Sequence, residues 1–161
     1  MPDIIVIAHN IRSTHNIGSI FRTCEGFGVK KIILSGYTPY PRTEDDARLP
    51  HIIDKMTGQI HKTALGAEVL VPFMHLDTLN LACAELAGYH IVALEQSPSS
   101  TTLRDYKPPE KIALLLGEEV HGVSPDLLAH VDDILEIPMR GKKESFNVSV
   151  ATGIALFQLS T

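Results

Sequence analysis

The sequence contains no tryptophan and only two cysteines among its 161 residues. Cys24 and Cys83 lack the Cys-x-x-Cys spacing of redox and zinc motifs, so we expect two buried thiols in a reducing, cytoplasmic location rather than a disulfide. The sequence also lacks the run of about 18 apolar residues that a membrane-spanning helix needs. Residues 1–3 do not begin a secretory signal, and we therefore predict no association with a membrane.

Several motifs of well-known chemistry are absent as well. The eight histidines include no H-x-x-x-H or H-E-x-x-H pair, and no cysteine lies near a histidine at ligand spacing, so we expect no metal site. The absence of G-x-S-x-G disfavours a serine hydrolase. The absence of G-x-G-x-x-G and of a Walker loop disfavours a dinucleotide site and a P-loop.

Positive charge is scarce overall but is unevenly distributed along the chain. The formal net charge of −5 does not indicate a nucleic-acid-binding protein. Residues 1–62 and 140–161 are nevertheless each net positive, whereas residues 63–139 are strongly acidic. If the two basic ends meet in the fold, they form a modest surface for phosphate groups. Ordinary solubilising charge is the alternative interpretation.

What the sequence does contain is an alternation of short apolar runs with helical patterns. The runs predict strands at residues 4–7, 31–34, 68–71, 90–94, 112–116 and 134–137. The helical patterns cover residues 14–28, 76–87, 125–130 and 147–159, and residues 36–50 and 96–109 are expected to be long loops. This order predicts a single α/β domain over residues 1–161, with a mostly parallel sheet and helices on both faces. Such sheets bind ligands at the carboxyl ends of their strands.

The first predicted helix carries a stripe of small and polar positions. Gly18 and Gly26 stand four residues on either side of Arg22 and therefore share one face with it. The stripe indicates either a groove in which Arg22 meets a phosphate or a reacting group, or close packing of a second helix. Asn16 lies near the start of this helix and is a candidate for its cap.

Two later segments are also candidates for a site. Residues 117–122 follow a buried strand, where Gly117 would let a ligand approach the backbone; a turn with solvated glutamates is the alternative. In residues 137–151, Ser145 and Asn147 can cap the last helix and leave backbone N–H groups free for a polar ligand. That helix is apolar on nearly every side, which indicates burial, including burial at a subunit interface.

The stretches that carry these candidates match one family in order and spacing. They are residues 16–23 followed by Phe27 and Gly28, residues 116–123, and residues 137–139 with residues 145–151; residues 62–67 match a further segment. Together they resemble the SpoU or TrmH-like RNA 2′-O-ribose methyltransferases of the SPOUT superfamily. Phe146 departs from the pattern, because the family often has Leu or Met there.

The resemblance implies a fold, a cofactor and partners. The fold would end in a C-terminal trefoil knot, which general topology rules do not predict. The cofactor would be S-adenosyl-L-methionine, and the substrate would be a ribose 2′-hydroxyl of tRNA or rRNA. The resemblance also implies a homodimer whose active site takes residues from both subunits. Since we expect no separate RNA-binding extension, the dimer surface would have to capture the RNA.

The resemblance also assigns roles to individual residues. It implies a catalytic pocket made by Arg22, Asn16, Glu119, Ser145 and Asn147, and cofactor contacts from Leu94, Glu95, Gly117, Ile137, Met139, Ser145 and Phe146. The family gives the arginine the role of base, but a guanidinium with a pKa above about 12 is better suited to anchor a phosphate and stabilise an oxyanion. Two alternatives stay open: a catalytically inactive RNA-binding or ribosome-assembly member, and an α/β nucleotide-binding domain with unrelated chemistry.

Overall fold

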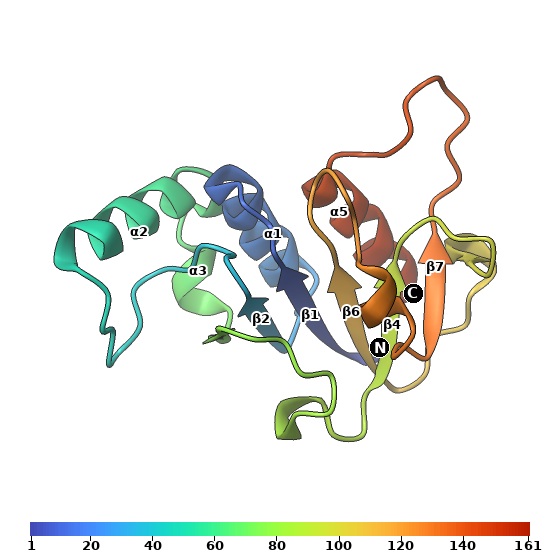
Figure 1. The fold of residues 1–161 in the computed structure, drawn as a ribbon, viewed down its shortest axis with the longest axis horizontal. Coiled ribbons are helices and arrows are strands. Elements are labelled where there is room, and N and C mark those ends of the chain that lie inside the picture. Colours follow the sequence, from blue (N-terminus) through green and yellow to red (C-terminus); the bar gives the residue numbers. More distant parts are fainter.

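A seven-stranded sheet crosses the molecule in the order β3-β2-β1-β6-β4-β7-β5 (Figure 1). The computed structural model describes all 161 residues. Its strands are β1 (Asp3–His9), β2 (Lys31–Ser35), β3 (Phe73–Leu76), β4 (His90–Leu94), β5 (Thr101–Thr102), β6 (Lys111–Leu116) and β7 (Asp133–Glu136). Every neighbouring pair is parallel, so all seven carboxyl ends lie at one edge of the sheet. The predicted α/β class and parallel sheet are confirmed.

The helices cover the two faces of the sheet unequally. They are α1 (Thr14–Gly26), α2 (Pro50–Ala64), α3 (Ala67–Leu70), α4 (Pro125–Leu128) and α5 (Val148–Leu159), with 3₁₀ turns η1 (Ala84–Leu86) and η2 (Leu103–Asp105). The larger core joins the sheet to α1, α2, α3 and α5, whereas the other face is covered by η1, α4 and their flanking loops. Helices therefore lie on both faces, but the second face carries only short ones.

Strand β1 shows how continuous apolar runs produce this arrangement. Because successive side chains of a strand point to opposite faces, Ile4 and Val6 enter the larger core, and Ile5 and Ile7 enter the smaller one. All four are at least 97% buried, as expected for a central strand covered on both faces.

Two of the predicted elements are wrong. Residues 68–71, predicted as a strand, lie mostly in helix α3, because the buried Glu68 carboxylate accepts hydrogen bonds from the Gly66 N–H at 2.9 Å and pairs with His61 at 2.5 Å. The edge strand begins only after Pro72. Residues 76–87, predicted as a helix, contain the end of β3 at Leu76, then turns and η1, because the Asn80 side chain accepts the Ala82 N–H and favours a turn.

Helix α2 was not predicted from the sequence, although the sequence contains signals for it. Pro50 occupies the first turn, where its missing N–H costs nothing. Ile53, Ile60 and Ala64 then recur at helical spacing and are buried. The apolar stripe of α2 is sparse, which explains why pattern alone did not predict it.

Both cysteines are free thiols. Cys24 is buried in α1, and burial raises the pKa of its thiol, which makes it a poor nucleophile. Cys83 is only half-buried, just before η1, so the prediction of two buried thiols is correct for Cys24 alone. No helix in the structure combines the length and the hydrophobicity needed to cross a membrane.

Candidate active site

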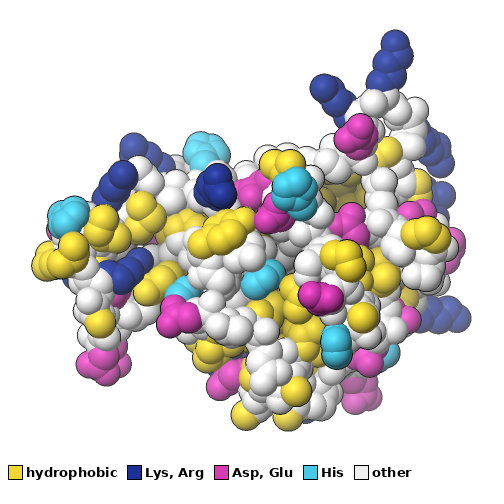
Figure 2. Space-filling model, viewed as in Figure 1, with side chains coloured by type: hydrophobic (Ala, Val, Ile, Leu, Met, Phe, Trp, Pro, Cys, Tyr) yellow, Lys and Arg dark blue, Asp and Glu magenta, His cyan; other side chains and the backbone are white.

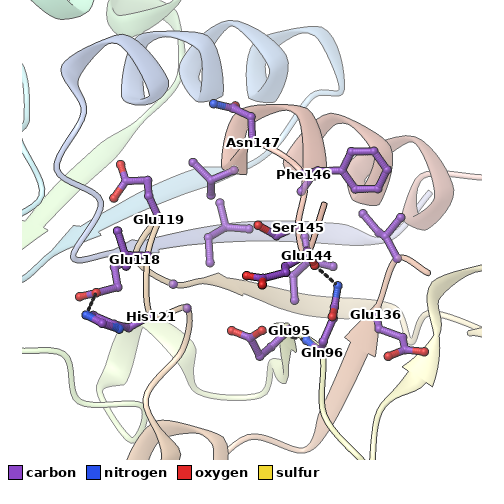
Figure 3. Close-up of a pocket in the computed structure, with 18 residues that line it drawn as sticks. Glu95, Gln96, Glu118, Glu119, His121, Glu136, Glu144, Ser145, Phe146 and Asn147 are labelled. Atoms are coloured by element: carbon purple, nitrogen blue, oxygen red, sulfur yellow. Dashed lines mark hydrogen bonds and ion pairs between the residues drawn. The ribbon is translucent and has the colours of Figure 1, made fainter. Parts of the chain in front are cut away.

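A cavity of about 560 Å³ lies at the carboxyl edge of the sheet (Figure 3). Its lining comes from stretches that are far apart in the sequence: residues 94–96, 116–122, 136–137, 144–148 and 151. Its volume is within the usual range for small-molecule sites, and its position is the one expected for a parallel α/β sheet. Two of the three candidate segments therefore form one pocket together with the end of β4.

Residues 117–122 form a tight turn, which we call the anchored turn. The N–H groups of Glu118 and Gly122 each donate to the carbonyl of the other residue, at 3.1 and 2.9 Å. Gly122 has a φ of +66°, and a Cβ on it would lie 1.8 Å from Glu95 Oε2. A Cβ on Gly117 would lie 2.3 Å from the Gly122 carbonyl carbon. The two glycines are therefore required by the packing of the turn itself.

The glutamates around this turn are bonded to protein rather than merely solvated. Glu119 accepts the backbone N–H groups of Arg12 and Ser13, at 3.3 and 3.2 Å. Glu95 accepts the N–H of Val123 at 2.9 Å, and Glu118 accepts the hydroxyl of Tyr37 at 2.9 Å. Partial burial and the bond to Glu118 raise the pKa of Tyr37, which keeps its hydroxyl a donor.

The first and third segments meet through two asparagines. The Asn147 side-chain amide donates to Asn16 Oδ1 at 3.2 Å, and Figure 3 shows Asn147 at the start of α5, directed toward α1. Asn147 also caps α5 by accepting the N–H groups of Ser149 and Val150. Ser13, not Asn16, caps α1, because the Asn16 N–H donates to Ser13 Oγ.

Residues 138–146 form a loop, which we call the open loop, and its residues 144–146 form the opposite wall of the cavity. No backbone group in this loop bonds to another backbone group. Its one hydrogen bond to the rest of the chain comes from the Gln96 side chain, which donates to the Glu144 carbonyl at 2.8 Å. Figure 1 shows the loop projecting from the molecule between β7 and α5. Its backbone N–H and C=O groups are therefore available to a ligand.

A second hollow, of about 610 Å³, lies next to the cavity. It is lined by Arg12, Ser13, Asn16 and Tyr37, and by residues 118–121, which also line the cavity. The anchored turn is thus a wall shared by two adjoining spaces.

Comparison with known proteins identifies the family. Residues 3–157 match the model of the SpoU rRNA Methylase family. The chain belongs to the SpoU methylase family. This membership confirms the resemblance that the three sequence segments predicted.

The relatives of this SpoU methylase chain include enzymes of both tRNA and rRNA. It is 33% identical over 156 residues to an Aquifex aeolicus tRNA (guanosine(18)-2′-O)-methyltransferase, covering 97% of the chain and 68% of the relative. An AdoMet-bound rRNA methyltransferase from Sinorhizobium meliloti superposes with a TM-score of 0.79 at 25% identity, covering 97% of this chain and 55% of that one. The chain spans only 58–63% of the length of several other bacterial relatives.

The charge of the SpoU methylase cavity distinguishes between ligand classes. Five glutamates line it and no lysine or arginine does: Glu95, Glu118, Glu119, Glu136 and Glu144. Such a lining disfavours the pyrophosphate of a dinucleotide and favours a ligand that carries positive charge. Leu94, Leu116, Ile137 and Phe146 supply an apolar surface for a flat ring system. These residues fit S-adenosylmethionine, whose sulfonium and amino groups are cationic. No group of three or more potential ligand side chains is arranged to hold a metal ion.

The structure gathers most, but not all, of the predicted site residues. The cavity lining includes Leu94, Glu95, Gly117, Glu119, Ile137, Ser145, Phe146 and Asn147, and Asn16 lines the adjoining hollow. Met139 and Arg22 line neither space, and Arg22 is exposed on α1. Tyr37 and Arg12, which the sequence analysis did not single out, lie in the hollow; an exposed aromatic after a buried strand was the available signal.

The glycine stripe on α1 has a structural explanation at one end. A Cβ on Gly18 would lie 2.3 Å from the Ile60 carbonyl oxygen and 2.9 Å from the Ala64 nitrogen, both in α2. Close helix packing, one of the two interpretations, therefore accounts for Gly18. A Cβ on Gly26 would meet nothing within 4 Å, so packing within the chain does not account for Gly26.

Proposed function

We propose that this chain transfers a methyl group from S-adenosyl-L-methionine to a ribose 2′-hydroxyl of tRNA or rRNA. The observation that carries the proposal is an acidic cavity of ligand size that two family motifs form and that the first motif meets through the Asn147–Asn16 hydrogen bond. Membership in the SpoU methylase family supports it. The presence of Asn16, Glu119, Ser145 and Asn147 at this junction favours an active enzyme over an inactive RNA-binding member.

The cavity suits the methyl donor in both shape and charge. Leu94, Gly117, Ile137 and Phe146 would hold the adenosine part, together with the free backbone groups of the open loop. Glu95 and its neighbouring carboxylates favour the cationic end. When bound, the cofactor supplies a methyl group that is already electrophilic, so a catalytic metal is not required.

The acceptor oxygen must be held in line with that methyl group, at roughly 3–3.5 Å, and must lose its proton. Asn16, Ser145 and Asn147 lie at the junction where an incoming ribose would be positioned. In this proposal Arg22 anchors the adjacent phosphate and stabilises developing negative charge, because a guanidinium is an excellent phosphate partner and a poor base.

Arg22 reaches the cavity in this proposal through a homodimer. Three apolar side chains on α5, Val150, Ile154 and Phe157, are 51%, 37% and 63% exposed and follow helical spacing, so they form a stripe that a second copy would cover. Helix α1 lies beside α5, where Phe27 packs against Phe157. The same interface would present Arg22 to the partner's cavity. The C-terminal trefoil knot is part of this proposal, and the Gln96–Glu144 contact between two loops is consistent with it.

The decisive experiment compares methyl transfer with cofactor binding. Wild-type protein should transfer tritiated methyl groups to RNA from a strain that lacks the gene, and ribose-methylation maps of the two strains should reveal the nucleotide. We expect Arg22→Ala to reduce transfer on the order of 10²- to 10³-fold while the calorimetric affinity for S-adenosylhomocysteine stays within about twofold.

Arg42→Ala is the matched control, because Arg42 is exposed, its guanidinium pairs only with Asp54, and it lines neither space. A loss of cofactor affinity equal to the loss of rate in Arg22→Ala would contradict the role of Arg22. Light scattering after size exclusion should show a dimer at micromolar concentration, and a monomer would contradict the shared site.

A further inference from the structure

Tyr37 is an exposed aromatic residue that is held by hydrogen bonds at its backbone N–H and at its hydroxyl. Tyr37 is 50% exposed. Its backbone N–H nevertheless donates to Asn10 Oδ1 at 3.1 Å, and its hydroxyl donates to Glu118 at 2.9 Å. The next residue, Thr38, is buried and donates to the carbonyls of Ala8 and Ser35. An apolar ring fixed at both ends and left open to solvent is arranged to receive a partner, because its rotamer entropy is already lost.

The hollow in which Tyr37 lies differs in charge from the cofactor cavity. Arg12 lines the hollow, with its guanidinium carbon 5.4 Å from the centre of the Tyr37 ring, and His121 lines it as well. Glu118 and Glu119 also line the hollow, but they accept hydrogen bonds from the Tyr37 hydroxyl and from the Arg12 and Ser13 N–H groups. The cavity contains no arginine or lysine. A ligand that combines a flat ring with an anionic group is therefore favoured in the hollow and disfavoured in the cavity.

We propose that the hollow binds the target nucleotide, with its base stacked on Tyr37 and its phosphate paired with Arg12. The inference rests on the proposed function and adds to it the residues that select a single-stranded, unstacked nucleotide. Residues 118–121 line both spaces, so the hollow and the cavity adjoin along the anchored turn, and the ribose of a bound nucleotide would reach past this turn to the methyl donor. Since every base has an aromatic face, Tyr37 provides affinity for an extruded nucleotide without choosing its identity.

The first test is a pair of substitutions at Tyr37 in the full chain. Tyr37→Ala should lower kcat/KM for bulk RNA from the gene-deletion strain by roughly tenfold to a hundredfold, with unchanged affinity for S-adenosylhomocysteine. Tyr37→Phe keeps the ring and loses only the hydroxyl bond, so it should stay within about threefold of wild type. If Tyr37→Phe loses as much as Tyr37→Ala, the hydroxyl tie and not stacking is responsible, and the proposal is wrong.

The matched control is Tyr89→Ala. Tyr89 also lies beneath a cation, with Lys111 Nζ 5.9 Å from its ring centre, but it precedes β4 at the opposite edge of the sheet. Its removal should leave kcat/KM for RNA within about twofold of wild type. Equal effects at Tyr37 and Tyr89 would overturn the assignment of the hollow.

A second measurement does not depend on catalysis. Because the chain has no tryptophan, Tyr37→Trp introduces a single fluorescent reporter at the proposed stacking site. Titration with the same bulk RNA should quench this tryptophan, whereas Tyr89→Trp should be unaffected. RNA binding without quenching at position 37 would overturn the inference. If the wild-type protein transfers no methyl group, the proposed function is wrong. The quenching of the tryptophan at position 37 by RNA would still test the inference.

Discussion

The two walls of the cofactor cavity are built in opposite ways. The anchored turn is closed by its own backbone hydrogen bonds and is tied to the rest of the chain through Glu95, Glu118 and Glu119. The open loop has no hydrogen bond between backbone groups, and its one hydrogen bond to the rest of the chain comes from the Gln96 side chain. One wall is therefore shaped before any ligand arrives, and the other keeps its backbone groups free for the ligand.

The anchored turn and the open loop also differ in charge. The anchored turn carries Glu118 and Glu119. The open loop contributes Glu144 to the cavity lining, and its outer part, which does not line the cavity, carries the exposed Arg140, Lys142 and Lys143. Figure 2 shows Lys and Arg side chains projecting at the upper right, where Figure 1 places the loop between β7 and α5. The glutamates of the anchored turn are used for internal bonding, and the basic side chains of the open loop remain exposed, where phosphate groups are accessible to them.

The largest expected effect is a difference in the free energy of unfolding between two glycine-to-alanine substitutions, one in the anchored turn and one in the open loop. Gly122→Ala forces a side chain into a positive φ and into the Glu95 carboxylate, which must release the Val123 N–H. We expect the free energy of unfolding to fall by roughly 2–4 kcal/mol in urea titrations, with weaker S-adenosylhomocysteine binding. Gly141→Ala has open space around its Cβ and should stay within about 0.5 kcal/mol of wild type. Equal costs at the two glycines would show that the walls do not differ in packing.

A smaller effect should appear in amide hydrogen exchange. The amides of residues 139–146 should exchange almost freely without ligand and slow by about tenfold or more in saturating S-adenosylhomocysteine, because the ligand becomes their hydrogen-bond partner. The amides of Gly122 and Val123 should be protected in both states. A loop that is already protected without ligand would contradict the contrast between the walls.

The smallest effect concerns pH and His9, at the carboxyl end of β1. Burial lowers the pKa of His9, which bonds to Ser35 Oγ at 2.9 Å, and the nearby Glu118 only partly offsets this. Because the folded pKa lies below the ordinary value of about 6.5, the stability from neutral His9 is full above that pH and is lost as the pH falls through the folded pKa. The wild type should therefore lose more stability than His9→Gln between about pH 7.5 and 5.5 in urea titrations. Parallel pH profiles for the two proteins would show that the burial of neutral His9 does not contribute to this pH dependence.

Several elements were predictable from local pattern. The buried strands β1, β2, β4 and β6 appear as uninterrupted apolar runs, and α1 and α5 as long helical patterns, because burial on two faces or on most sides leaves little room for polar residues. The site motifs were also visible, since Asn16, Gly117 and Asn147 each stand at the end of such an element. The errors at residues 68–71 and 76–87 arose where side chains such as Glu68 and Asn80 bond to nearby groups and override the apolar pattern.

Residue order thus set the parallel α/β class, the family and the segments that form the site, because these depend on periodicity and on motifs that are short and local. Three-dimensional packing decided that the glutamates hold the turn, that Ser13 rather than Asn16 caps α1, and that Tyr37 borders the site. It also placed Arg22 on an exposed face away from both spaces. Contacts such as that between Asn16 and Asn147 join residues 131 positions apart, and no local pattern specifies which distant partners will meet.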